Sequence, residues 1–516
     1  MNNSLQVVYK YHETTKHSQL HYARSLGYMD WATQPDPFRN YNGAKILKLP
    51  LAIKNTTPPY HLLDDDLPSA PLVKESLSQL LQFSMGIAAW KESGGSSWAV
   101  RCNASSGNLH PTEAYVILPP VLKEQDNKTT IYHYTPKDHA LEILTQFDTP
   151  FWEKLPNGSF IIGLSSITWR EVWKYGERAF RYTQLDAGHA WQSFVVSAKM
   201  LGWKITRLDS ISNSDMSTLF GFEQKERFFE SENSDMLFIV SPDKVEPSLS
   251  LDTLIENIPL KFEGIANKIS PNMQNWDIIP AIEDATTDSE IPQKKIERCQ
   301  IKRHPSQESK DVVLNRRSVH VMQHDMSKIT KIQFHNILKS IALSQDAKVN
   351  SAHLAIFVHQ VEDYEAGLYI LIRNGRDKND LIEQMNSSFE WKKAELENLY
   401  LLESKDYTVI SKAISCSQNI ASDGAFSLGM LCNFSQQIQD HGAHRYKELY
   451  WECGAIGQQL YLEATSMGLS GTGIGCFLDD DMHRLLGLKD NRFQILYHFT
   501  VGRGYVDSRI LTKPAY

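Results

Sequence analysis

The strongest constraint on this chain is an internal repeat with a constant spacing. The segment DAGHAWQSFVVSAKMLGW, which begins at Asp186, matches ECGAIGQQLYLEATSMGL, which begins at Glu452, 266 residues later (452 − 186). In the same register, LFGF at 219–222 matches LLGL at 485–488. Apolar residues at helical spacing and a closing glycine predict a long helix in each copy. A chance likeness between two helices is the alternative, and the downstream match disfavours it.

A duplication predicts two domains of the same kind. Segments such as EAYVIL, LFIVS and HFTVG add strands to the repeated helices, so the predicted fold is α+β, with two domains that each hold a mixed or antiparallel sheet flanked by helices. Burial of the repeated helical faces against each other would make an intramolecular pseudo-dimer with function at its interface. The predicted segments are an N-terminal extension (1–60), domain 1 (61–242), a polar linker (243–311) and domain 2 (312–516).

Composition excludes several function classes. No run of about 18 apolar residues and no secretory leader is visible, so we expect no membrane partner and a cytoplasmic protein. A net charge of −8 without a basic cluster argues against a nucleic-acid partner. The six cysteines form no C-x-x-C pair, so the sequence predicts ordinary thiols and no metal.

A short polar loop, NASSGN at 103–108, precedes the apolar strand EAYVIL. Its serine and asparagine side chains fill a core poorly and suit hydrogen bonding to a ligand. Nothing else in the first copy offers a phosphate contact, so we expect its partners elsewhere in the chain.

The second copy opens with the motif LNRRSVHVM, followed by a predicted helix with Ser327 as its N-cap. Arg316 and Arg317 offer charge-assisted forks and Ser318 a hydroxyl, which together suit a phosphate. A solvent-exposed arginine pair is the alternative.

Two glycine-containing segments follow in the second copy. Gly471, Gly473 and Gly475 remove side chains from one segment and would let backbone N–H groups approach a flat ligand; a flexible turn is the alternative. The next acidic run, 479–481, is expected to cap a helix rather than bind a metal. The last strand ends in G-R-G, which presents Arg503 as a third cation for the phosphate.

As a set, these motifs resemble the FMN-dependent nitroreductase superfamily. R-R-S before a helix, S-S-x-N before a strand, G-x-G after the long helix and a terminal Gly-Arg are its pattern. The runs DWATQPDPFRNY, SSGNLHPTEAYVI and KYGERAFRYTQLDAGHAWQ resemble its SagB/ThcOx-type branch, flavin dehydrogenases that oxidise azolines in modified peptides. The resemblance implies two nitroreductase-like domains and a bound FMN.

The two copies carry complementary halves of the family's flavin site. The first lacks the R-R-S, glycine and Gly-Arg motifs, and the second lacks S-S-x-N. The resemblance therefore implies one FMN per chain and a second site that is degenerate. The implied flavin-binding residues are Asn103, Ser105, Ser106 and Asn108 from domain 1, with Arg316, Arg317, Ser318, His320, Gly473, Gly475 and Arg503 from domain 2. His320 stands where many relatives carry arginine or lysine.

The K-Y-G motif of the branch falls on Lys174 and Tyr175, the predicted catalytic pair. Azoline oxidation removes a proton from carbon, for which a base is useful. The alternative is that the pair only stiffens a turn with Arg178 and Arg181. His110 and Glu113 could line the pocket, but we expect them simply to start a strand.

The sequence thus predicts an FMN-dependent oxidoreductase of the SagB type acting on an azoline ring in a peptide or on a related small molecule. One alternative is an NAD(P)H-dependent nitro or quinone reductase, and another is a non-catalytic flavin-binding or scaffold subunit. Candidate partners are the other proteins of a peptide-modifying complex. The charged insert at 376–415 is expected to be a helical lid or a solvated helix.

Overall fold

The computed structural model describes residues 3–208, 211–287, 306–341 and 351–516. The chain folds into two compact units. Unit 1 comprises residues 1–24, 293–307 and 315–509, and unit 2 comprises residues 25–292, 308–314 and 510–516. Both ends of the chain therefore fold with the half of the sequence that is distant from them. The predicted segments did not include this exchange of the chain ends between the units. The partners of a terminal helix or strand are set by tertiary packing, which no local sequence pattern reports.

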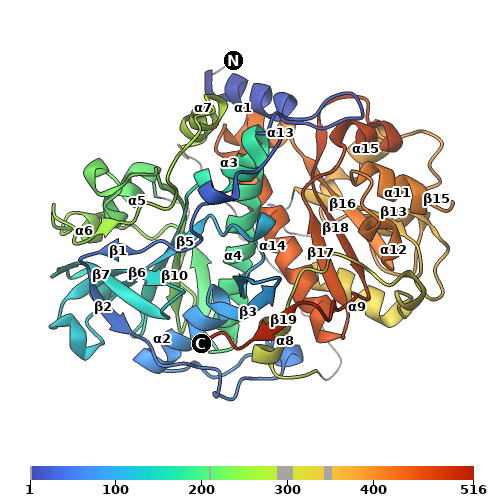
Figure 1. The fold of residues 1–516 in the computed structure, drawn as a ribbon. Helices are drawn as coiled ribbons and strands as arrows, with labels where there is room; N and C mark the ends of the chain where they lie inside the picture. Colours follow the sequence, from blue (N-terminus) through green and yellow to red (C-terminus); the bar gives the residue numbers. More distant parts are fainter. Residues whose placement is uncertain (1–2, 209–210, 288–305, 342–350) are drawn as a thin grey trace. The chain divides into compact units, whose positions relative to one another are not determined.

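Unit 2 is built on a seven-stranded antiparallel sheet (Figure 1). Its strands, in spatial order, are β2 (Lys45–Lys48), β7 (Ala140–Phe147), β6 (Thr129–Thr135), β5 (Thr112–Leu118), β8 (Phe160–Ser166), β10 (Asn233–Ser241) and β9 (Lys204–Arg207). β5 and β8 are buried along their whole length, which explains their nearly continuous apolar sequences. At Gly163 in β8 a Cβ would lie 2.0 Å from the ring of Phe220, the last residue of α5 (Asn213–Phe220), so this glycine lets α5 pack onto the sheet.

The helices of unit 2 pack on this sheet and on one another. They include α2 (Lys74–Ser84), α3 (Trp169–Tyr175), α4 (Ala179–Lys199) and α5 (Asn213–Phe220). Nearly all of α4 is buried, polar residues included. Buried polar groups need hydrogen-bond partners, so the buried polar side chains of α4 are expected to bond to neighbouring segments as well as to pack.

Unit 1 repeats the architecture with its own seven-stranded antiparallel sheet. Its strands, in spatial order, are β14 (Lys392–Lys393), β15 (Leu399–Ser404), β13 (Gly367–Leu371), β12 (Ala352–Val358), β16 (Phe426–Asn433), β18 (Phe493–Gly502) and β17 (Ser470–Ile474). The helices include α1 (Asn3–Thr14), α9 (Lys331–Ile341), α14 (Arg445–Ser466) and α15 (Asp479–Leu486). The predicted fold class, two α+β units, is confirmed.

The 266-residue offset is visible in the elements themselves. It carries the first residue of α4 onto that of α14, and it carries α5 onto α15 at both ends. The glycines after α5 and α15, Gly221 and Gly487, both adopt left-handed backbone angles, with φ of 70° and 68°. Only glycine adopts this conformation without strain, so the repeated L-x-G-x pattern marks the same helix ending twice.

The predicted polar linker is, up to residue 287, part of unit 2. It contains α6 (Asp252–Ile255), α7 (Ile278–Ala285) and β11 (Ile265–Ala266), which pairs with β1 (Tyr41–Asn42). Leu254 and Phe262 join the main apolar cluster of the unit. Sparse apolar residues without a regular period were enough to anchor this segment, which is why the sequence suggested a linker. Residues 288–305 lie outside the described part.

The insert at 376–415 is not the helical lid or solvated helix that the sequence predicted. Short helices α10 (Lys378–Gln384) and α11 (Thr408–Ile414) flank β14 and β15, and β15 pairs with β13 inside the sheet. Leu399 and Leu402 are buried. The charged residues around them hid a strand whose apolar positions face the core.

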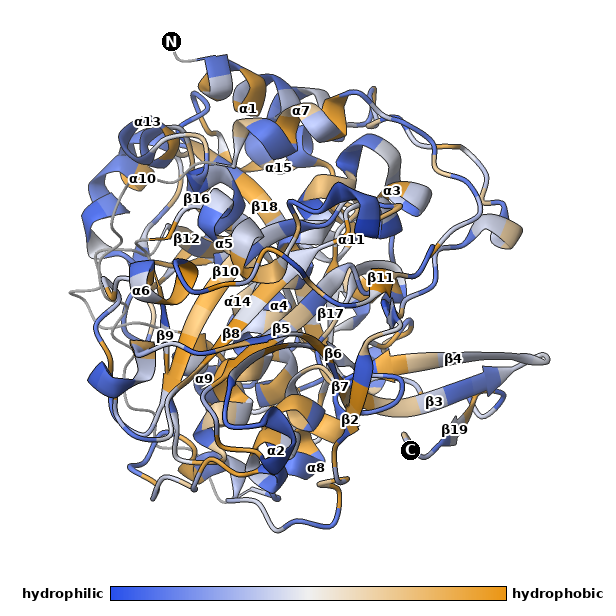
Figure 2. Cartoon of the chain, turned by 90° about the vertical axis from the view of Figure 1, so that its left-hand side faces the viewer, coloured by the Kyte–Doolittle hydropathy of each residue, from blue (hydrophilic) through white to orange (hydrophobic). Residues whose placement is uncertain are grey.

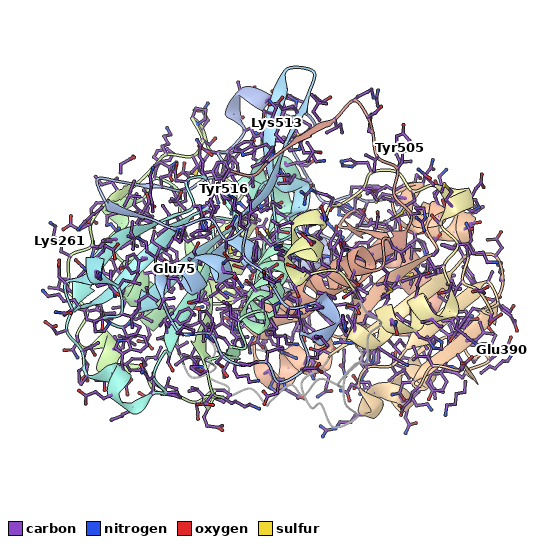
Figure 3. The ribbon with its side chains drawn as sticks, turned by 90° about the horizontal axis from the view of Figure 1, so that it is seen from below. Glu75, Lys261, Glu390, Tyr505, Lys513 and Tyr516 are labelled. Carbon is purple, nitrogen blue, oxygen red and sulfur yellow. The ribbon has the colours of Figure 1, made fainter. Side chains whose placement is uncertain are left out.

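The C-terminal residues close unit 2 beside a hairpin (Figures 2 and 3). β3 (Ile87–Ser93) and β4 (Ser96–Arg101) form the hairpin, and β19 (Leu511–Lys513) pairs with β3. The Tyr516 hydroxyl accepts a hydrogen bond from the Ile87 amide at 2.9 Å and donates one to the Pro136 carbonyl at 2.7 Å. These bonds fix the last residues of the chain to unit 2.

None of the helices in the described ranges combines the length and the apolar character needed to cross a bilayer.

Candidate functional site

In unit 1, the predicted phosphate and glycine motifs meet at Tyr461 on α14. The Tyr461 and Ser318 hydroxyl oxygens lie 2.7 Å apart, and the Gly473 amide donates a hydrogen bond to the Tyr461 hydroxyl at 2.8 Å. The Arg316 guanidinium lies 5.1 Å from the centre of the Tyr461 ring, within the range of a cation–π contact. A single tyrosine therefore joins two motifs that are more than 150 residues apart.

Backbone contacts hold the same two motifs together. Ser318 forms a parallel bridge with Gly471, and the Val319 amide donates to the Thr472 hydroxyl at 3.0 Å. That hydroxyl in turn donates to the Val319 carbonyl at 2.7 Å. The segment after the arginine pair thus lies along β17, beyond the edge of the sheet.

The arginine motif presents side chains in two environments. Arg316 is buried, whereas Ser318 and His320 are exposed and Arg317 is half-buried. One Nη of Arg317 donates to the Arg316 carbonyl at 2.6 Å, which orients its guanidinium. The alternative of a solvated arginine pair does not describe Arg316.

The glycine segment is a strand and not a flexible turn. Gly471 and Gly473 lie in β17, which pairs with β18. A Cβ at Gly473 would lie 1.8 Å from the Tyr497 hydroxyl, and one at Gly471 would lie 2.8 Å from the Phe499 ring. Aromatic packing from β18 therefore demands glycine at both positions, a reason that the sequence did not reveal. Gly475 follows the strand.

Arg503 follows β18 and joins the first two motifs. Its backbone carbonyl accepts a hydrogen bond from Gln323 at 2.8 Å, and its Nε donates to the Met326 carbonyl at 3.3 Å. A Cβ at Gly504 would lie 2.6 Å from the Val319 side chain and 2.7 Å from the Ser470 hydroxyl. The three predicted motifs of the second copy thus form one cluster in unit 1.

Ser327 has a different role from the predicted one. Helix α9 begins at Lys331, and Thr330 and Gln333 exchange the hydrogen bonds of a capping box. The Ser327 hydroxyl instead accepts a hydrogen bond from the Arg503 amide at 3.1 Å. The helix therefore starts three residues later than predicted. Ser327 and Thr330 are both good N-cap residues, and Ser327 bonds to Arg503 whereas Thr330 caps the helix.

In unit 2, the predicted polar loop is fixed by a carboxylate on α4. The Ser106 amide and hydroxyl both donate to Asp186, at 2.9 to 3.0 Å. The Ser105 hydroxyl accepts from the His110 amide at 2.8 Å, and Asn108 donates to the Ala99 carbonyl at 2.8 Å. Three of the predicted polar side chains therefore shape the loop itself.

Asn103, the fourth polar residue of this loop, is 2% exposed. Its amide oxygen has no hydrogen-bond partner within the described residues. A buried acceptor of this kind is costly unless a ligand or water satisfies it.

The predicted catalytic pair lies against the same loop. A Cβ at Gly107 would lie 2.8 Å from the Tyr175 hydroxyl and 3.1 Å from the Lys174 ammonium nitrogen. That nitrogen is also 5.4 Å from the centre of the Tyr175 ring. The Tyr175 ring packs on Tyr182, whose hydroxyl accepts a hydrogen bond from Arg178 at 3.2 Å. The structure thus brings Lys174 and Tyr175 to the polar loop. It also places Tyr175 beside Tyr182 and Arg178, as the alternative of a turn stiffened by these residues predicts.

Two buried carboxyl groups beside this pair were missed by sequence reasoning. Burial raises the pKa of Asp186 to about 7, although hydrogen bonds from the loop serines oppose the shift. Burial, reinforced by the charge of Asp186, raises the pKa of Glu171 well above its usual range. Neither carboxylate oxygen of Glu171 has a hydrogen-bond partner in the ranges that the structure describes. The only signal in the sequence was the i, i+3 spacing of Glu171 and Lys174 on one helix.

His110 and Glu113 serve the structure, as the sequence favoured. Glu113 lies at the start of β5, and Arg170 bonds to both the Glu113 carboxylate and the His110 carbonyl. Burial would raise the pKa of Glu113, but Arg170 and His133 outweigh it and hold the pKa at about 2. This ion network links α3 to β5 and β6 in unit 2.

The two units differ where the flavin motifs were predicted to differ. β9 occupies in its sheet the edge position that β17 occupies in the other, and its sequence, KITR, contains no glycine. β10 is followed by Pro242, whereas β18, in the corresponding position, is followed by Arg503. The second copy has DAKVNSAH (346–353) after its first helix, where the first copy has the polar loop, and most of this segment lies within 342–350, outside the described residues.

Comparison with known proteins agrees with this architecture. A structure of a protein from Anabaena variabilis whose description places it among the nitroreductases covers 97% of this chain and 99% of its own, with a TM-score of 0.71 and 20% identity. A protein of Methanocaldococcus jannaschii named as a nitroreductase is 29% identical over 58 residues, which is 11% of this chain and 29% of that relative. The likeness to the Anabaena structure concerns the fold alone. The match to the Methanocaldococcus protein covers less than a third of that relative's length.

The nitroreductase family model matches residues 68–229 and 364–503, more than half of the chain, with one match in each half. The matched segments contain the polar loop and the predicted catalytic pair of unit 2 and the glycine and Gly-Arg motifs of unit 1. The chain therefore belongs to the nitroreductase family.

Proposed function

We propose that this protein is an FMN-dependent dehydrogenase of the SagB type that oxidises an azoline ring in a modified peptide or a related small molecule. Members of its family are flavin-dependent oxidoreductases. The observation that carries the proposal is the convergence, in unit 1, of Arg316, Ser318 and Gly473 on the single side chain of Tyr461.

The residues of unit 1 fit a phosphate-bearing flavin. Arg317 and Ser318 keep exposed or half-exposed side chains next to the buried Arg316, and the exposed Arg503 precedes Gly504, which packs on Val319. Together they give cationic and hydroxyl donors of the kind that bind phosphate. Gly471 and Gly473 leave one face of β17 without side chains of its own, and Gly475 follows the strand. These residues would hold the phosphate and the edge of the ring, with His320 as an exposed neighbour.

The loop of unit 2 is proposed to contribute the remaining contacts. Asn103 supports this assignment, since its buried amide oxygen needs a donor and a flavin ring edge carries both donors and acceptors. Ser105, Ser106 and Asn108 would mainly hold the loop in its binding conformation. The chain would then bind one FMN.

FMN, when bound, supplies the acceptor for the hydride that leaves the substrate. The protein's own residues must position the substrate and move a proton. Lys174 and Tyr175 are the proposed proton-transfer pair, because both polar atoms lie at the Gly107 backbone of the proposed flavin loop. Glu171, whose pKa burial raises well above its usual range, and Asp186, whose pKa burial raises to about 7, lie in the same buried region and would set the electrostatic field around the lysine.

Flavin content and reactivity with nicotinamide cofactors test this function. The purified protein should be yellow, and denaturation should release about one FMN per chain. Arg316→Ala should lower the FMN content severalfold, whereas Arg376→Ala, an exposed arginine of the same unit, should leave it unchanged. A colourless protein whose thermal stability does not respond to FMN would refute flavin binding and favour a scaffold role.

Anaerobic mixing with NADPH separates the two enzymatic functions. The proposed dehydrogenase should keep its flavin absorbance over many minutes, and it should lose that absorbance when an azoline-containing peptide is added. Rapid bleaching by NADPH together with no response to the peptide would instead identify a nitro or quinone reductase.

A further inference from the structure

Three separate segments of unit 1 bring one imidazole and two thiols together. His17 follows α1, Cys416 follows α11, and Cys476 lies between β17 and α15. The ligating atoms of the three side chains all lie within 4.8 Å of one another. We propose that His17, Cys416 and Cys476 form a binding site for one zinc ion.

The geometry is close to what a zinc site needs. Zinc bound by cysteine and histidine is tetrahedral, with Zn–S distances of about 2.3 Å and Zn–N distances of about 2.0 Å, so its ligating atoms lie roughly 3.5 to 3.8 Å apart. The Cys476 sulfur and the His17 Nδ1 are already 3.9 Å apart. The ligating atom of Cys416 lies within 4.8 Å of the other two, so side-chain rotations that shorten these distances by about 1 Å would give the spacing of a zinc site.

The backbones that carry the three ligands are fixed without any metal. The His17 amide donates to the Asp479 carboxylate at 2.9 Å, which ties the N-terminal segment to the start of α15. The Leu478 amide donates to the Ile414 carbonyl at 2.7 Å, and Gln418 donates to the Cys476 carbonyl at 3.1 Å. The loops that bear Cys416 and Cys476 are thus bound to each other, so little ordering would accompany metal binding.

Two aspartates of the acidic run in α15 have a structural role in this region. Asp479 and Asp481 accept hydrogen bonds from the backbone of His17 and Gln19, at 2.9 and 3.3 Å. The aspartates therefore anchor the segment that carries the histidine, and the soft ligands lie beside them. A sequence search for closely spaced cysteines could not find this site, because 60 residues separate Cys416 from Cys476 (476 − 416).

The chemistry of the ligands selects the ion. Two thiolates and one imidazole favour a borderline or soft ion such as zinc and disfavour magnesium and calcium, which prefer oxygen ligands. Three protein ligands leave a fourth position for water. The Tyr22 ring, whose centre lies 4.7 Å from that of His17, covers part of the cluster while its side chain stays half exposed.

Cobalt substitution of the reduced, chelator-treated full-length protein tests the site. We expect one equivalent of Co²⁺ to produce thiolate-to-cobalt charge-transfer absorption, and one equivalent of Zn²⁺ to displace it. Cys476→Ser and His17→Gln should each weaken zinc affinity at least about tenfold in a chelator competition. The matched controls are Cys453→Ser, a buried thiol of the same unit, and His21→Gln, an exposed histidine of the same segment; both should bind like the parent protein.

The unsubstituted protein gives a second measurement that does not depend on the folding of variants. Zinc should protect Cys416 and Cys476 from alkylation, as mapped by mass spectrometry, and should leave Cys102 unaffected. Absence of charge-transfer absorption, or unchanged affinity in both ligand variants, would overturn the proposal. So would a Cys416–Cys476 disulfide in the isolated protein, seen as a mass lower by two hydrogens, if the reduced form then bound no zinc.

Discussion

At the scale of single residues, buried polar side chains hold the predicted motifs in place. Tyr461 joins the arginine and glycine motifs of unit 1, and Asp186 holds the polar loop of unit 2. Each lies in the long repeated helix of its unit, where the sequence shows only helical periodicity. Substitution of Tyr461 or Asp186 should therefore lower flavin binding as well as stability, because each side chain holds a proposed flavin-binding motif.

Lys174→Met should remove the proposed proton-transfer group while retaining the aliphatic chain that packs on Gly107. We expect kcat/KM on an azoline-containing peptide to fall by about 10² to 10⁴, the range expected for loss of a general base. FMN content should stay at the level of the parent protein. Lys204→Met, at a half-exposed lysine on β9, is the matched control. Retention of full activity by Lys174→Met would leave the lysine with a purely structural role.

Asp186→Asn should change how stability depends on pH. Because the folded-state pKa of Asp186 is raised to about 7 from 3.8, the folded protein binds the extra proton between these values, and the stability contributed by this group falls as pH rises from about 4 to 7. The asparagine variant lacks this loss. Its free energy of unfolding relative to the parent should therefore rise by about 1 to 3 kcal/mol between pH 5 and pH 8 in urea titrations.

The exposed Asp148→Asn provides the control for this titration. It should follow the parent protein at both pH values. If the curves of Asp186→Asn and the parent stayed parallel, Asp186 would ionise in the folded protein as it does in the unfolded one.

At the scale of elements, β17 shows how a packing requirement can fix glycines that the sequence motif assigned to ligand binding. Its glycines are required by Tyr497 and Phe499 on β18, whose side chains fill the space of the missing Cβ atoms, while the Gly471 backbone bridges to Ser318. Glycine in this strand thus has a structural cause that is independent of flavin.

Gly473→Ala should destabilise unit 1 whether or not FMN is added. The new Cβ would lie 1.8 Å from the Tyr497 hydroxyl, so the strand or the tyrosine must shift, at a cost of about 1 to 3 kcal/mol. Thermal denaturation should show a lower midpoint, and Tyr497→Phe in the same chain should restore part of the loss. Gly375→Ala, where no atom lies within 4 Å of the new Cβ, should change the midpoint little. Equal midpoints for the two alanine variants would contradict this packing argument.

The elements also show what the sequence could predict. The repeat placed α14 and α15 correctly, because a duplicated helix keeps its period and its terminal glycine. The strand β15 and the packed segment around Leu254 were missed, since short apolar runs among charges have no period that distinguishes them from loops. The three motifs of unit 1 were predicted together, but Tyr461 was not, because a tyrosine on a buried helix looks like any core aromatic.

At the scale of the whole molecule, the two units retain complementary sets of motifs. Unit 2 has the polar loop and the lysine–tyrosine pair, but its edge strand β9 lacks glycine; unit 1 has the arginines, the glycine strand and Arg503. This complementary distribution is the one that a single site built from both copies predicts. We therefore expect residues of both units to contribute to the binding of a single FMN.

The number of FMN molecules per chain tests this claim most directly. We predict about one FMN per chain in the parent protein, and severalfold less both in Arg316→Ala, from unit 1, and in the double variant Ser105→Ala and Asn108→Ala, from unit 2, with each variant still folded by circular dichroism. Two FMN per chain, or full FMN content in the loop variant, would contradict the account.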